Sequence, residues 1–204
     1  MKIDSFRAMR IATALGLAGL LSGMTPSFAE DICSGYYLAA DAGLNLADNL
    51  SARNFSISLD PGFRLDASAG YAFKLSNQFS LAPEFEAGFI YNSFSINSSS
   101  GYYMQVPLIA NALLNWRFSS GWVAYAGGGV GYNYNYFSDS HIGGFSLGPA
   151  ANGEFDFAWQ AMAGIHYHFG GGEIGLGYKY LAVQPSDWQT VGNNTILISY
   201  TFYF

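Results

Sequence analysis

The fold is decided by the stretch 196-ILISYTFYF-204, which alternates strictly and has one wholly apolar face. That face holds Ile196, Ile198, Tyr200, Phe202 and Phe204, while Thr195, Ser199 and Thr201 lie on the other. A soluble protein rarely exposes an apolar stripe of this extent to water. A strand in the wall of a membrane barrel needs one, because its outer neighbour is lipid. The stretch therefore predicts a barrel strand.

The same period of two recurs seven more times along the chain, between breaks rich in Gly, Ser and Asn. The eight predicted strands cover residues 35–45, 62–74, 78–93, 103–118, 121–135, 157–169, 172–182 and 196–204. Short connections alternate with longer ones, the longer ones following Asn45, Ser93, Asn135 and Ala182. Outer-membrane barrels join an even number of antiparallel strands by short periplasmic turns and longer extracellular loops. We expect residues 30–204 to form an all-β, eight-stranded antiparallel up-and-down transmembrane β-barrel.

Alternation alone leaves open which face points inward, since a soluble lipocalin-like barrel has the same period with its apolar face inside. In this chain one face carries bulky Phe, Tyr, Trp and Leu side chains, and the other carries mostly Gly, Ala, Ser and Asn. An eight-stranded barrel is only just wide enough inside for side chains, so the bulky face does not fit there. We therefore expect the bulky face to contact lipid and the small face, with its few charges, to line the lumen.

Residues 1–29 are predicted to be a cleaved secretory signal peptide. Lys2, Arg7 and Arg10 precede an apolar core that ends at the small-residue site Ser27-Phe28-Ala29. The core is shorter than the roughly 20 residues that a spanning helix needs. The whole chain has 8 basic and 14 acidic residues, which argues against nucleic acid as a partner. Because Cys33 is the single cysteine, an internal disulfide is excluded.

Three stretches, 124-AYAGGGVGY-132, 158-AWQAMAGIHY-167 and 176-LGYKY-180, carry a resemblance to a known family. The chain resembles the small opacity-type, OmpA-like outer-membrane β-barrel proteins of Gram-negative bacteria. The resemblance implies a surface-exposed barrel in the bacterial outer membrane, with no catalytic residues to carry over. It also implies that Phe202 and Phe204 form the signal read by the barrel-assembly machinery. Ser199 departs from the Gly that is usual shortly before the final aromatic pair.

Charged side chains on the predicted lumen face form the most suggestive set in the sequence. They are Arg64, Asp66, Glu84, Glu86, Arg117 and Lys179. In a narrow pore such charges act as a constriction or gate. In a filled lumen they form a network of paired ions, because unpaired burial of a charge is costly. The small bore of eight strands favours the structural interpretation.

Two histidines on the sixth predicted strand, His166 and His168, also point inward, and Glu173 follows across the next turn. Together they offer ligands for a metal ion, but such residues are more often hydrogen-bonded lumen groups. Outer-membrane lipid A deacylases share this architecture and carry a His-x-Ser pair on one strand. Here His166 is followed by Tyr167-His168, and His141 by Ile142-Gly143, so that pattern is absent. We assign no catalytic, cofactor-binding or metal-binding residue, and expect the protein not to be an enzyme.

The function expected from the sequence is therefore that of a non-enzymatic outer-membrane surface protein. It has a structural role in the envelope, contacts the lipid bilayer and lipopolysaccharide, and offers extracellular loops to a ligand, host protein or envelope protein. The loops are mildly acidic, with Asp48, Asp60, Asp139, Glu154, Asp156 and Asp187 against Arg53. Residues Phe55, Ile57 and Leu59 share the parity of the second strand, so we expect the sheet to continue outward there. The alternative function is a narrow porin for small solutes.

Overall fold

The computed structural model describes residues 34–52, 55–96, 99–138, 141–142, 145–146, 155–169, 171–184 and 189–204. The predicted signal peptide and Cys33 lie outside these residues. No helix in the described part of the chain is long and apolar enough to cross a membrane.

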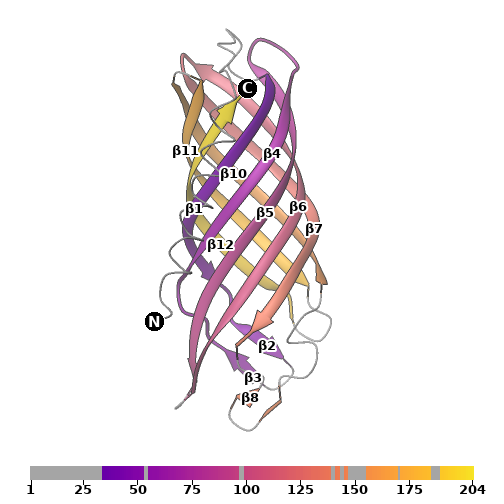
Figure 1. Cartoon of the computed structure of the whole chain (residues 1–204), viewed down its shortest axis with the longest axis vertical. Helices are drawn as coiled ribbons and strands as arrows, with labels where there is room; N and C mark the ends of the chain where they lie inside the picture. The colour runs from indigo at the N-terminus through magenta and orange to yellow at the C-terminus, as the bar shows by residue number, and fades with distance from the viewer. Residues whose placement is uncertain are drawn as a thin grey trace, which may run out of the picture.

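Eight long strands close into one antiparallel barrel, as predicted (Figure 1). They are β1 (Gly35–Ala47), β4 (Gly62–Lys74), β5 (Phe79–Ile96), β6 (Ser99–Ser119), β7 (Trp122–Phe137), β10 (Phe155–Phe169), β11 (Gly172–Gln184) and β12 (Val191–Tyr203). Each strand pairs with its neighbours in the chain, and β1 closes the ring by pairing with both β4 and β12. Closure leaves no unpaired sheet edge, which is what a lipid environment requires of strands.

Short hairpins occupy one end of the barrel, and tight turns the other. The pairs β2 (Leu50–Ala52) with β3 (Phe55–Ile57) and β8 (His141–Ile142) with β9 (Phe145–Ser146) lie at the end we call the hairpin end (Figure 1). The opposite end, the turn end, carries the C-terminus and the connections β4–β5, β6–β7 and β10–β11 (Figure 1). Gly121 and Gly171 supply the positive φ that two of these turns use.

The two faces of the wall follow the predicted alternation. Tyr36, Leu65, Phe85 and Ile198 are among the large apolar side chains exposed on the outside, at 49–60%. Arg64, which lies beside Leu65 in the sequence, is 1% exposed inside. The bulky apolar face is therefore the outer wall and the small, charged face is the lumen, as the volume argument predicted.

Phe202 and Phe204 lie on the outer wall at the turn end, where the last strand meets the first. Their rings are 6.4 Å apart, and Phe204 stacks on Tyr36 of β1 at 6.2 Å. Tyr36 contacts Tyr71 of β4 at 4.7 Å. An aromatic row thus crosses the seam between β12 and β1, as expected of an interfacial girdle.

The prediction of a long loop after Ser93 is wrong. β5 and β6 continue as a paired hairpin as far as Ser95↔Ser100 and Ile96↔Ser99, so the connection is short. The expected outward continuation through Phe55, Ile57 and Leu59 is found only as far as Leu59, which bridges to Phe94 of β5. Residues 55–57 pair with 50–52 instead, and Ile57 and Leu59 are buried at 0% and 8%. Ile57, Leu59 and Phe94 point inward because above the lipid the outer neighbour is water.

Candidate functional site

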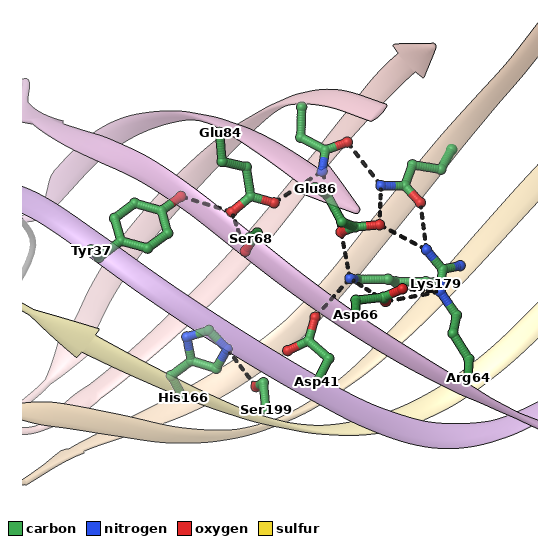
Figure 2. Close-up of polar contacts among 12 residues, drawn as sticks. Tyr37, Asp41, Arg64, Asp66, Ser68, Glu84, Glu86, His166, Lys179 and Ser199 are labelled. Carbon is green, nitrogen blue, oxygen red and sulfur yellow. Dashed lines mark hydrogen bonds and ion pairs between the residues drawn. The ribbon is translucent and has the colours of Figure 1, made fainter. Parts of the chain in front are cut away.

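A buried cluster of charges crosses the middle of the lumen, centred on Lys179 of β11 (Figure 2). Its Nζ donates to Asp41 at 2.7 Å, to Asp66 at 2.9 Å and to Glu86 at 2.6 Å. These carboxylates come from β1, β4 and β5, which stand two, three and four positions from β11 in the strand order, so that β5 lies opposite β11. One ammonium group therefore ties β11 to three strands with which β11 does not pair.

Arg64 of β4 adds a second cation to the cluster. Its Nε donates to Asp66 at 2.8 Å, and its Nη2 donates to Glu86 at 2.8 Å and to Gln160 at 3.0 Å. Gln160 in turn donates to Glu86 and Asn111. The two cations face three carboxylates, and every member is held by charge-assisted hydrogen bonds, the strong class of such bonds.

The structure brings together four of the six charged residues predicted to form a network: Arg64, Asp66, Glu86 and Lys179. Glu84 stands one step away, linked through Asn111, and accepts hydrogen bonds from Tyr37 and Ser68 (Figure 2). Arg117 is not part of the cluster, because it lies at the turn end beside Lys74 and Gln78. Asp41 is not among the predicted charges; it joins the cluster because it lies opposite Asp66 in the β1–β4 register.

Oxygen atoms of Asp41, Asp66 and Glu86 lie within 4.8 Å of one another, an arrangement that resembles a cation site. The Lys179 ammonium sits within 2.9 Å of all three side chains and occupies the place of the cation. The described lumen therefore satisfies these carboxylates with its own side chains.

A layer of neutral amides lies next to the cluster on its hairpin side. Asn45 donates to Asn92 and Asn193, and Gln105 and Asn193 exchange reciprocal hydrogen bonds of 3.0 and 3.1 Å. All four side chains are 0% exposed. Asp156, predicted to be a loop residue, belongs to this region as well: it is 5% exposed and accepts a hydrogen bond from Asn135.

An apolar plug closes the hairpin end above the amides. We use this name for Leu50, Ile57, Leu59, Phe94, Tyr103, Phe137 and Val191, which are 0–8% exposed and form one cluster. The rings of Tyr103 and Phe137 stack at 4.4 Å. Charges, amides and apolar side chains therefore fill the lumen in three successive layers from the middle outward.

The turn end of the lumen is organised differently, around a cavity of about 40 Å³. His166, Ser199, Tyr37 and Tyr125 are among its lining residues. The predicted cluster of His166, His168 and Glu173 does form: Glu173 is 3.2 Å from His166 Nδ1 and 3.8 Å from His168 Nδ1. Ser199, which the sequence marked only as a departure from Gly, is hydrogen-bonded to His166 (Figure 2).

The whole barrel has close counterparts among solved structures. Neisserial surface protein A (NspA) matches with a TM-score of 0.57 and 18% identity, covering 84% of this chain and 99% of that one. The outer membrane protein OprG from Pseudomonas aeruginosa matches with a TM-score of 0.51 and 12% identity, over 84% and 98%. The fold is that of the small outer-membrane β-barrels. The resemblance seen in the sequence is thereby confirmed at the level of architecture. No protein-family model matches the sequence, and neither does any curated protein sequence.

Proposed function

We propose that this protein is a closed barrel of the bacterial outer membrane that presents its hairpin end at the cell surface, and that this end acts by contact with partners. The observation that carries this proposal is the apolar plug, because it makes the hairpin end a packed surface and not a pore mouth. The exposed apolar outer wall supports a lipid environment, since side chains such as Tyr132 and Ile198 are 59–60% exposed there.

The orientation follows from the two ends of the barrel. Short turns face the periplasm in outer-membrane barrels, so the turn end and the aromatic seam with Phe202 and Phe204 belong on that side. In this arrangement the final strand is available to the barrel-assembly machinery. The β2–β3 and β5–β6 hairpins then extend toward lipopolysaccharide and the medium.

The hairpin end offers a surface for partners. A row of tyrosines, Tyr91, Tyr102 and Tyr136, runs across β5, β6 and β7 on the outer side, with ring centroids 5.6 and 6.2 Å apart. Tyrosine combines an apolar ring with a hydroxyl and suits the headgroup level, where lipopolysaccharide lies. We propose that this row contacts lipopolysaccharide and that the hairpins above it contact a host or envelope protein.

A narrow porin is the competing function. The layers of the lumen argue against it, because Glu86, Asn45, Gln105 and Asn193 are all 0% exposed and touch other side chains instead of water. Conduction through this stack requires breaking the Lys179 ion pairs and displacing the plug.

Single-cysteine labelling on intact cells tests the location and orientation together. In a Cys33→Ser background, Ser100→Cys stands at the tip of the β5–β6 hairpin and Ser76→Cys in the β4–β5 turn, both at exposed positions. A membrane-impermeant maleimide should label the first on intact cells and the second only after the outer membrane is opened. Equal labelling of both on intact cells, or of neither, contradicts the proposed placement.

A further inference from the structure

We infer that the turn end of the lumen carries a serine esterase site, with Ser199 as nucleophile, His166 as general base and Glu173 as the residue that positions the histidine. Ser199 Oγ lies 3.0 Å from His166 Nε2, and His166 Nδ1 lies 3.2 Å from Glu173 Oε2. This is the order and spacing of a catalytic triad, which is recognised by geometry and not by sequence position. The inference does not rest on the surface role, which belongs to the other end of the barrel.

The three residues come from adjacent strands of the wall. In the register, His166 of β10 lies opposite Gly175 of β11, and Gly175 lies opposite Ser199 of β12. The imidazole therefore has to cross β11 to reach the serine, and Gly175 leaves room for it. A Cβ at Gly175 would stand 1.9 Å from His166 Cδ2, well inside contact distance. The missing side chain is what allows the hydrogen bond between His166 and Ser199.

Glu173 is buried and contacts the histidine, not solvent. Its side chain is 2% exposed, while those of His166 and His168 retain 14% and 20% exposure. Tyr203 donates to the same oxygen, Oε2, at 3.3 Å. A carboxylate in this position fixes the imidazole tautomer with its proton on Nδ1, which leaves Nε2 free to accept a proton from Ser199.

The cavity beside Ser199 sets the size of the substrate. Its volume of about 40 Å³ corresponds to roughly three water molecules or one acetyl group. Tyr125 also lines it, its ring packs against the ring of His166 at 4.6 Å, and its hydroxyl lies beside Gly164 and Gly177. The substrate class is therefore a short-chain acyl ester whose acyl group fits the cavity.

The chemistry is hydrolysis in two steps. Ser199 Oγ attacks the ester carbonyl carbon while His166 Nε2 takes the hydroxyl proton. The carbon–oxygen bond to the alcohol then breaks, and His166 returns that proton to the leaving alkoxide. Water attacks the acyl-serine with His166 again as base, and the acid leaves as Ser199 recovers its proton. Ester and water give acid and alcohol, with no further reactant.

Methanesulfonyl fluoride is a suitable probe, because its sulfonyl group is about as large as acetyl and bonds to activated serines with loss of fluoride. The full-length barrel, folded in detergent, should gain one methanesulfonyl group on Ser199. Ser68 and Thr201 line the same cavity without a histidine partner and should stay unmodified. p-Nitrophenyl acetate should be hydrolysed, and p-nitrophenyl octanoate much more slowly.

Variants separate catalysis from structure. His166→Ala and Gly175→Ala should each slow modification of Ser199 by about 10²-fold or more, the contribution typical of a general base. Glu173→Gln should slow it too, and Glu173→Asp should restore part of the rate. Ser199→Gly, which installs the residue usual at that place in such barrels, should fold and lose both reactions. Absence of labelling at Ser199 in the wild type, or labelling that His166→Ala leaves unchanged, overturns the proposal. Neither result bears on the surface labelling of Ser100→Cys.

Discussion

Lys179 shows how a single side chain can organise a lumen without a bound ion. It is 3% exposed and reaches three carboxylates on three strands, so its removal leaves Arg64 as the one cation in the cluster. Buried charges are costly unless they are paired, and deleting one partner of a buried pair typically costs 3–5 kcal/mol.

We expect Lys179→Met to lower the free energy of unfolding of the barrel by about 3–5 kcal/mol. Denaturant unfolding in detergent or lipid vesicles measures this change. Adding Glu86→Gln should recover part of the loss, since it removes one of the carboxylates left in excess. Lys74→Met, at an exposed position of the turn end, should change stability by no more than about 0.5 kcal/mol. Equal effects of Lys179→Met and Lys74→Met would contradict the role given to the cluster.

Some side-chain contacts could be predicted from the sequence and others could not. The alternation along each strand is enough to predict the charges of the cluster, because the register keeps them on the inner face: Arg64, Asp66, Glu86 and Lys179. The hydrogen bond between Ser199 and His166 cannot be predicted in this way, since it joins β12 to β10 across Gly175. A His-x-Ser motif joins neighbours in sequence on one strand, whereas His166 and Ser199 are neighbours only in space.

At the scale of the element, β5 changes character along its length. Phe89 and Tyr91 point outward in the part expected to meet lipid, but beyond them Phe94 points inward at 1% exposure and Ser95 is exposed. The apolar face thus switches sides where the strand leaves the wall that contacts lipid. The outward apolar alternation stops at Tyr91, so the sequence predicts that this strand ends near Ser93. Aromatic residues lie at odd positions up to Tyr91 and then at the even position 94. This change predicts that the strand extends beyond the part that contacts lipid.

The plug depends on this switch, and Phe94→Ala tests it. Removing a buried phenylalanine ring typically costs 3–5 kcal/mol, and here the loss falls on the contacts that hold the β2–β3 hairpin. Arg53 lies between β2 and β3 in the sequence, so trypsin cleavage after Arg53 reports release of that hairpin. Cleavage should become at least tenfold faster in Phe94→Ala.

The matched control is Phe155→Ala, which removes a ring that is 62% exposed on the outer wall. It should leave the rate of cleavage after Arg53 unchanged. A rate that does not respond to Phe94→Ala would mean that the plug does not hold the hairpin.

At the scale of the whole molecule, the two ends of the barrel have different structures. The hairpin end is packed with apolar side chains and amides, while the turn end holds a small cavity and partly exposed histidines. Strand number, strand order and the choice of inner and outer face all follow from the period of two and from side-chain volume. The layering of the lumen does not, because it depends on which inward residues of non-adjacent strands meet at one level.

Ion conductance tests the central claim, that the lumen is closed, most directly. Purified full-length protein, inserted into a planar lipid bilayer and verified as folded, should give no discrete conductance steps, because the charge cluster, the amide layer and the plug block the path in series. Reproducible single-channel steps from the wild-type protein, with an ion selectivity that Arg64→Gln alters, would contradict it.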